Sequence, residues 1–146
     1  MTTLTLRRML IAMVAVLMSF QGAAVAQSPN TVTDLSMYPG PPNVVKFGET
    51  VWVYFNYDTT EMAGVRIWAR PISTDPVTGD DMLTPNYGAC GSPLHAAGSG
   101  TGSSCFSIFY TGVSNVTVDK VRVQMWDANG TTLLFSAKVP VHFKFR

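Results

Sequence analysis

The last third of the chain alternates apolar and polar residues with a period of two. Two such segments, Val118–Asp127 and Thr131–Phe145, flank the tetrapeptide Asp127-Ala128-Asn129-Gly130. Asn-Gly between alternating segments is the strongest short-range signal for a β-hairpin, because these residues tolerate the positive φ angles that its tight turn requires. The chain is therefore predicted to build its core from antiparallel strands.

Segments further upstream repeat this alternation. Glu49–Tyr57 and Val65–Ala69 place apolar residues at every second position, whereas Thr31–Met37 and Phe106–Thr111 are weaker candidates. Pro140 interrupts the last segment and marks an edge or a bulge, because proline cannot donate a ladder hydrogen bond. Six or seven short strands without helical periodicity predict an all-β fold. We expect an antiparallel, two-sheet immunoglobulin-like sandwich of about seven strands.

Residues 71–104 differ from the predicted strands on either side. They are rich in Gly, Ser, Thr and Pro, show little periodicity and culminate in the run Gly98-Ser99-Gly100-Thr101-Gly102. We expect an irregular insertion here, with the glycine-rich run as a mobile loop. The two cysteines, Cys90 and Cys105, are expected to form a structural disulfide, as isolated pairs in exported chains usually do. This bond would tether the long loop to Phe106–Thr111.

The N-terminal 26 residues resemble an export signal. Arg7 and Arg8 precede the apolar run Met9–Met18, and Ala24-Val25-Ala26 follows as a small-residue cleavage site. These parts make up a secretory signal peptide over residues 1–26. The apolar run is shorter than the roughly 20 residues that a bilayer requires. Residues 27–146 are thus expected to be a single domain, exported to the periplasm or the extracellular space, with no membrane span after cleavage.

Charge and motifs narrow the range of functions. The chain holds ten Lys and Arg residues and nine Asp and Glu residues, and eight basic residues remain without Arg7 and Arg8. This near-neutral balance argues against general nucleic-acid binding, which needs dense basic residues to neutralise phosphates. The sequence contains no G-x-S-x-G, H-E-x-x-H or G-x-x-x-x-G-K motif. We therefore expect no enzymatic activity and no cofactor.

The candidate metal ligands are sparse. Asp75, Asp80 and Asp81 form the acidic cluster of the insertion, and carboxylates in a loop can bind Ca²⁺. Their spacing matches no EF-hand loop, so the cluster is interpreted as a solvated acidic turn. His95 and His142 are far apart in the sequence and are expected at the surface. No metal site is predicted.

Strand parity gathers tryptophan and arginine on one predicted surface. If the strands that begin at Val65, Val118 and Thr131 are neighbours, their outward positions form a mixed aromatic and basic face. Such a face suits an anionic glycan or a protein hot spot rich in Trp and Arg. Two structural alternatives remain open: cation–π pairs that merely cover the sheet, and burial of both tryptophans by the insertion. The candidate binding residues are Arg66, Trp68, Arg70, Arg122, Trp126 and Lys138.

Four segments resemble a small immunoglobulin-like domain of uncharacterised exported bacterial proteins. They are Phe47-Gly48-Glu49-Thr50-Val51, Gly64-Val65-Arg66-Ile67-Trp68-Ala69-Arg70-Pro71, Gly98-Ser99-Gly100-Thr101-Gly102 and Val118-Asp119-Lys120-Val121-Arg122. The resemblance spans most of residues 27–146 and implies the fold and the exported compartment. It supplies no catalytic residue.

Two functions follow as expectations. The first is a secreted, non-enzymatic binding module that recognises an extracellular glycan or a surface protein through an exposed Trp/Arg sheet face. The alternative is a structural subunit of a cell-surface assembly, which would pair or self-assemble through an edge strand. Val139–Phe145 is the candidate edge, because its apolar alternation could pair with another chain if left open.

Overall fold

The computed structural model describes residues 29–146, so the predicted signal peptide over residues 1–26 lies outside the described residues. The described chain consists of ten strands without any helix, and thus includes no helix that could cross a membrane. The strands are β1 (Thr31–Tyr38), β2 (Asn43–Val45), β3 (Thr50–Thr59), β4 (Val65–Thr74), β5 (Asp81–Leu83), β6 (Tyr87–Ala89), β7 (Leu94–His95), β8 (Gly98–Ile108), β9 (Val116–Asp127) and β10 (Leu133–Phe145).

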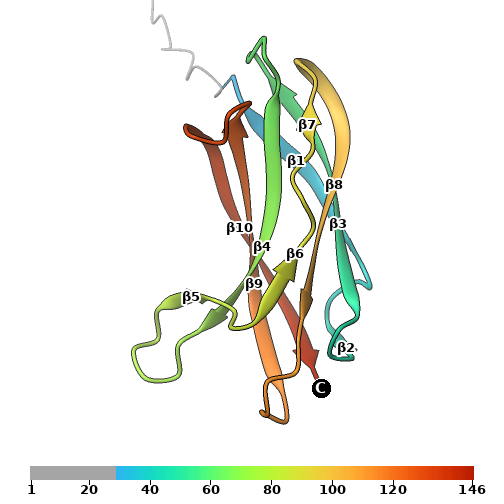
Figure 1. Ribbon diagram of the computed structural model, residues 1–146, viewed down its shortest axis with the longest axis vertical. Coiled ribbons are helices and arrows are strands. Elements are labelled where there is room, and N and C mark those ends of the chain that lie inside the picture. Colours follow the sequence, from blue (N-terminus) through green and yellow to red (C-terminus); the bar gives the residue numbers. More distant parts are fainter. Residues whose placement is uncertain (1–28) are drawn as a thin grey trace, which may run out of the picture.

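The strands form two sheets that pack face to face (Figure 1). Sheet A has the order β1-β3-β8-β6, and sheet B has the order β2-β10-β9-β4-β5, with β7 also paired to β4. Neighbouring strands are antiparallel except for β2 and β10, which are parallel. The predicted all-β, two-sheet architecture is confirmed. The strand number exceeds the expected seven because strands of two or three residues carry no detectable periodicity.

The core fills the space between the sheets with inward residues of β3, β4, β8, β9 and the end of β10. On β3, Val51, Val53 and Phe55 are buried, whereas Trp52 and Tyr54 between them are exposed. This alternation is what a strand with one face in the core requires. The largest buried rings are Phe106, Phe143 and Phe145.

The predicted hairpin at the end of β9 is confirmed. The Asp127 N–H donates to the Thr132 carbonyl at 3.0 Å, and Gly130 adopts a φ of 73° in the turn. The Asp127 carboxylate accepts the backbone N–H groups of Thr131 and Thr132 at 2.7 and 3.1 Å. These hydrogen bonds favour the ionised carboxylate and hold the pKa of Asp127 below its ordinary value.

The prediction of a mobile glycine-rich loop is wrong. Gly98–Gly102 is the first half of β8, and its alternate glycines face the core opposite the aromatic residues of β3. A Cβ atom at Gly100 would lie 2.6 Å from the Tyr57 hydroxyl oxygen. A Cβ at Gly102 would lie equally close, at 2.6 Å, to ring atoms of Phe55 and His95. The glycines therefore make room for rings, and flexibility is not their role.

The rest of the insertion is also ordered. It contributes the end of β4, then β5, β6 and β7, and passes between β4 and β8 along one open side of the sandwich (Figure 1). The predicted disulfide is confirmed: Cys90, just after β6, is bonded to Cys105 of β8, and its N–H donates to the Cys105 carbonyl at 3.1 Å. Residues 75–97, between the end of β4 and the start of β8, thus form a side wall.

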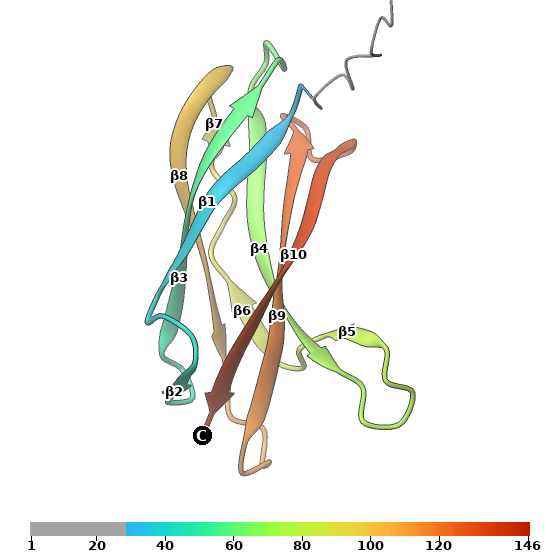
Figure 2. The same ribbon diagram turned by 180° about the vertical axis from the view of Figure 1, so that it is seen from behind.

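The C-terminal strand is less open than expected. Its last three residues, Phe143–Phe145, pair with Asn43–Val45 of β2, so that end of the predicted edge is covered. Figure 2 shows the C-terminus beside β2 at the lower end of the sandwich. The expected irregularity at Pro140 is confirmed, because the β9–β10 register shifts between Pro140 and Phe143.

Candidate functional site

The structure assembles the predicted Trp/Arg residues of β4 and β9 as neighbours. Arg66 is paired with Trp126, and Arg70 with Arg122. The ring centroids of Trp68 and Trp126 lie 5.4 Å apart, and the Arg70 guanidinium lies 5.0 Å from the Trp68 ring centroid. Strand parity therefore predicted the juxtaposition correctly.

These side chains do not form an exposed face, which corrects the prediction. Arg66, Trp68, Arg70, Arg122 and Trp126 are all half-buried. The segment after β6 lies against β4, where Arg66 donates to the Ser92 carbonyl at 2.7 Å and the Ser92 hydroxyl donates to the Ile67 carbonyl at 3.1 Å. Of the two structural alternatives, cation–π pairs that cover the sheet describe this arrangement, because the Arg70 guanidinium lies over the Trp68 ring.

Several polar atoms of this cover are inaccessible to a ligand. The Trp68 indole N–H donates to the Gln124 side-chain oxygen at 3.3 Å. Arg70 Nη1, Arg122 Nε and Trp126 Nε1 are buried without a hydrogen-bond partner in the described part of the chain. Donors that are buried in this way cannot meet a glycan without local opening of the structure.

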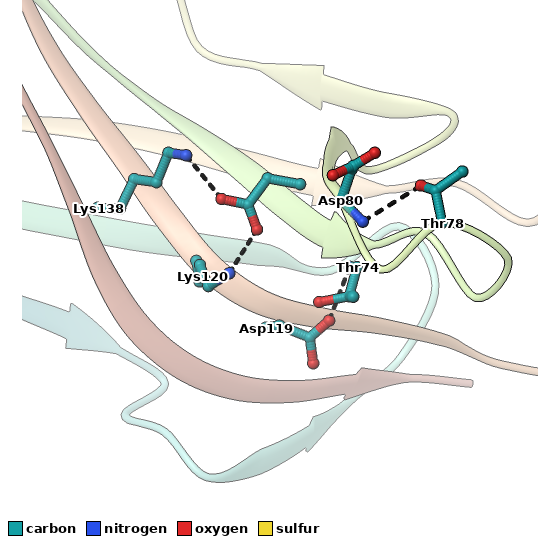
Figure 3. A network of polar contacts seen from close by, with 7 residues as sticks. Thr74, Thr78, Asp80, Asp119, Lys120 and Lys138 are labelled. Carbon is teal, nitrogen blue, oxygen red and sulfur yellow. Dashed lines mark hydrogen bonds and ion pairs between the residues drawn. The ribbon is translucent and has the colours of Figure 1, made fainter.

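Lys138 is paired with Arg122 across β9 and β10, but its side chain differs in exposure from the other predicted binding residues. It is exposed on β10, and its ammonium donates to the Asp81 carboxylate at 2.6 Å. Lys120 of β9 binds the other oxygen of the same carboxylate, as Figure 3 shows. The two ammonium groups favour the ionised form and lower the pKa of Asp81.

The other acidic candidates are engaged within their own turn. The Asp75 carboxylate accepts the backbone N–H groups of Val77 and Thr78 at 2.7 and 3.2 Å, which lowers its pKa. The Asp80 N–H donates to the Thr78 hydroxyl at 3.2 Å. Within residues 29–146, no three His, Cys, Asp or Glu side chains are grouped so that they could hold a metal ion. The acidic cluster is a hydrogen-bonded turn and an ion-pair partner.

His95 was expected at the surface but packs under sheet A. Its ring centroid lies 5.7 Å from that of Phe55 and 5.2 Å from that of Tyr57. Its Nε2 atom is buried and has no hydrogen-bond partner among the described residues. Burial disfavours the imidazolium and lowers the pKa of His95. His142, on β10, is exposed as expected.

The opposite surface of the sandwich has a different charge. The four strands of sheet A contain no Lys or Arg, and their two charged residues are Asp34 and Asp58. Every basic residue of the described chain lies on sheet B or in the segments next to it: Lys46, Arg66, Arg70, Lys120, Arg122, Lys138, Lys144 and Arg146. The two faces are thus chemically distinct.

Three exposed aromatic residues lie side by side on sheet A. Tyr38, Trp52 and Tyr54 are 71%, 39% and 45% exposed. Trp52 and Tyr54 share the outward side of β3, and Tyr38 of β1 is paired directly with Trp52. Their outward position follows from the inward position of Val51, Val53 and Phe55 on the same strand. The rings project from β1 and β3, and the inward side chains of β3 pack in the core.

A polar hollow of about 450 Å³ adjoins these rings. Tyr54 lines the hollow, together with the Asp34 carboxylate and the Asn56 amide. The hydroxyls of Ser36, Thr101 and Ser103 complete its polar lining. We use the name aromatic face for the outward residues Asp34, Ser36, Tyr38, Trp52, Tyr54, Asn56, Thr101 and Ser103.

A bulge in β1 positions the carboxylate of the hollow. The β1–β3 register shifts between Thr33 and Ser36, and Asp34 within it has a φ of 51°. Aspartate is one of the few residues other than glycine that adopts this conformation readily. The Asn56 amide donates to Asp34 Oδ2 at 2.7 Å, which holds the carboxylate over the sheet.

A larger cavity of about 520 Å³ lies between the β4–β5 hairpin and the β8–β9 loop. Its polar groups are already bonded to one another: the Ser73 hydroxyl contacts the Thr84 hydroxyl at 2.8 Å and donates to the Thr117 carbonyl at 2.6 Å. Asp119 accepts the Thr74 N–H at 2.9 Å. The cavity is lined mainly by apolar groups, which include Met82, Val113 and Val116, whereas polar side chains make up most of the lining of the hollow on sheet A.

The alternation over Glu49–Tyr57 places Trp52 and Tyr54 on the side opposite Val51 and Val53, but it does not identify them as a site. The available signal was the lack of Lys and Arg in the strands of sheet A together with three aromatic residues at outward positions. Parity alone does not say which of two outward faces is buried by neighbouring side chains.

Comparisons with known proteins give little guidance. No family model matches the chain, and no curated protein matches it. A solved structure of similar shape is that of the Pseudomonas fluorescens alkylpurine DNA glycosylase AlkC bound to DNA containing an abasic site analog, with a TM-score of 0.39 and 16% sequence identity. The similarity covers 83% of this chain and 31% of the glycosylase chain. A likeness at this level transfers no activity.

The predicted function is corrected accordingly. We expected a secreted, non-enzymatic module that binds an extracellular glycan or a surface protein through an exposed Trp/Arg face, or a subunit that pairs through an edge strand. The comparisons supply no evidence for such a module. In addition, five of the six predicted binding residues are half-buried, and β2 covers one end of the predicted edge.

Proposed function

We propose that residues 29–146 form an immunoglobulin-like domain that recognises an extended polypeptide through the aromatic face of sheet A. The strand order supports the fold. Taken in chain order, β1, β3, β4, β6, β8, β9 and β10 correspond to strands A to G of a constant-type immunoglobulin sandwich, with A-B-E-D in one sheet and G-F-C in the other. The short strands β2, β5 and β7 are additions to this plan.

The exposed row of Tyr38, Trp52 and Tyr54 carries the functional proposal. Trp and Tyr supply large, rigid contact area at low conformational-entropy cost, and they dominate the energetics of protein recognition surfaces. Serine and asparagine beside them provide adaptable hydrogen bonds, and Ser36, Asn56 and Ser103 occupy those positions here. A face of this composition suits a polypeptide.

The proposal includes no catalytic step. The titratable groups that could support one have structural partners: Asp75 and Asp127 accept backbone N–H groups, and Asp81 binds two lysines. The His95 ring is packed between Phe55 and Tyr57. Each group stabilises a turn, an ion pair or the core.

Export from the cytoplasm is also part of the proposal. It is supported by the signal-like pattern of residues 1–26 and by the Cys90–Cys105 disulfide, because disulfides form and persist mainly in oxidising compartments.

A random peptide library selected against the full-length chain tests the function. We expect the selected peptides to lose binding to a Tyr38→Thr/Tyr54→Thr variant, which removes two rings and keeps a residue suited to strands. A Leu133→Thr variant, which alters a similarly exposed apolar residue on sheet B, serves as the matched control. Selected peptides that bind the double variant as well as the wild type, or a library that yields none, would contradict the proposal.

A further inference from the structure

We infer, resting on the proposed function, that the hollow beside Tyr54 binds a lysine or arginine side chain of the recognised polypeptide. The partner is therefore a basic segment. Four features of the aromatic face lead to this assignment: its acceptor groups, its aromatic ring, its lack of basic residues and the opposite charge of sheet B.

The polar groups of the hollow include a full set of acceptors for a cation. An ammonium or guanidinium group only donates hydrogen bonds, so it needs acceptors on several sides. The Asp34 carboxylate uses one oxygen to accept from Asn56, and a carboxylate has about four acceptor sites in all. The hydroxyls of Ser36, Thr101 and Ser103 can also accept, and they line the same hollow.

Tyr54 adds a second favourable interaction for a cation, a cation–π contact. Its ring lines the hollow together with Asp34 and is 45% exposed. A cation within about 6 Å of an aromatic centroid is attracted by the negative face of the ring. Trp52, which follows the same side of β3 toward Tyr38, extends this surface for the aliphatic stem of a long basic side chain.

The hollow contains no competing internal cation. The strands of sheet A hold no Lys or Arg, so the Asp34 carboxylate has no ion-pair partner on them. Asp81 on sheet B provides the contrast, because Lys120 and Lys138 already neutralise it. Asp34 is thus a carboxylate whose charge remains available to a partner.

The charge of the two faces orients a basic partner. Lys120, Arg122, Lys138 and Lys144 on sheet B repel a basic segment, whereas Asp34 and Asp58 on sheet A attract it. Complementary charge of this kind raises the association rate and excludes wrong partners. An acidic polypeptide would be repelled by sheet A and attracted to sheet B.

The test uses a matched pair of peptides and the three tryptophans of the full-length chain as reporters. The probe is a ten-residue Gly/Ser peptide with two lysines, and its counterpart carries both lysines acetylated, which removes their charge. Indole N–H resonances are assigned by single Trp→Phe variants. We expect the lysine peptide to shift the Trp52 resonance and to leave those of Trp68 and Trp126 in place.

Charge removal on either partner should weaken binding. We expect the acetylated peptide to bind at least fivefold more weakly, and the lysine peptide to bind Asp34→Asn about three- to fivefold more weakly, within the range of a solvated ion pair. Asparagine tolerates the positive φ of position 34 and can keep the contact with Asn56. Asp80→Asn makes the same charge change far from the hollow and should bind as the wild type does.

The outcomes separate this inference from the proposed function. Equal binding of both peptides at the Trp52 resonance would overturn the cation assignment and leave polypeptide recognition intact. A lysine peptide that shifts Trp68 or Trp126, or shifts no indole while library peptides bind the aromatic face, would also overturn it. Failure of the library experiment would instead remove the proposed function itself.

Discussion

The two outer surfaces of the sandwich both carry tryptophan but use it differently. On sheet B, Trp68 and Trp126 contact each other and are half-buried, with the Arg70 guanidinium over the Trp68 ring. On sheet A, Trp52 stands beside Tyr38 and Tyr54 in a row of exposed rings. The comparison teaches that an outward strand position is available to a partner only when the neighbouring side chains leave it open.

The sharpest test of this difference is to remove the rings from each face. We expect a Trp68→Ala/Trp126→Ala variant to lose about 4 kcal/mol of unfolding free energy, because large buried rings leave cavities. Trp52→Ala/Tyr54→Ala should lose less than half as much, since both rings already contact water. Urea unfolding of the two variants measures the difference. Equal losses would show that the two faces are energetically alike.

The disulfide fastens the segment after β6 to β8 of sheet A. Replacing Cys90 and Cys105 by serine should lower the unfolding free energy by about 3 kcal/mol, as expected for a loop of about 15 residues. Because Cys105 is paired with Trp52 across β3 and β8, loss of the bond should raise the solvent accessibility of Trp52 more than that of Trp68. Acrylamide quenching in single-tryptophan variants tests this point, and equal quenching changes at both sites would contradict it.

The glycines under the aromatic face should not tolerate substitution by larger residues. Gly102→Ala places a methyl group 2.6 Å from ring atoms of Phe55 and His95, so we expect a loss of about 2 kcal/mol from overpacking. Gly91→Ala, where the new methyl meets nothing within 4 Å, is the matched control. Chemical denaturation of both variants measures the effect. A stable Gly102→Ala protein would mean that these rings move aside easily.

His95 should make the stability of the sheet A side depend on pH. Because burial lowers its pKa in the folded state, the unfolded chain binds the proton more readily. Stability is therefore fully present above the unfolded pKa of about 6.5 and falls as the pH drops below it. The unfolding free energy should be lower at pH 5.5 than at pH 7.5 in the wild type. His95→Phe should reduce that difference, and an unchanged difference would assign the effect to another group.

The exposed ion pairs of sheet B should matter least. We expect Lys120→Ala and Lys138→Ala to leave the urea midpoint unchanged within error, because solvated ion pairs contribute little. The informative comparison is with Trp68→Ala on the same sheet. A large loss from either lysine variant would show that charges, rather than rings, hold this cover in place.

Periodicity in the sequence predicted much of the fold. The alternation on β3, β4 and β9 located the core residues, Asn129-Gly130 located the hairpin, and the cysteine count located the disulfide. The run Gly98–Gly102 was misread because its composition is typical of flexible loops, although its parity places glycine opposite aromatic rings. Strands of two or three residues, such as β7, carry too few positions to show a period.

The candidate site was less predictable than the fold. Parity brought Trp68 and Trp126 together correctly, but their half-burial depends on how neighbouring side chains such as Arg70 pack against them, which is a matter of tertiary structure. Asp34 was not singled out because its place over the sheet depends on a bulge and on a contact with Asn56, which lies 22 residues away. Local patterns do not encode contacts of this kind.

The pairing of β2 with the end of β10 has a consequence for the order of events during folding. Asn43 meets Phe143, and Val45 meets Phe145, so one of the first strands to emerge waits for the last residues of the chain. Closing such a distant contact is slow compared with local helix formation, and folding of sandwiches dominated by such contacts takes milliseconds to seconds. Until then the apolar residues of β2 and β3 lack part of their cover. The nascent chain therefore has to avoid other contacts until residues 143–145 arrive.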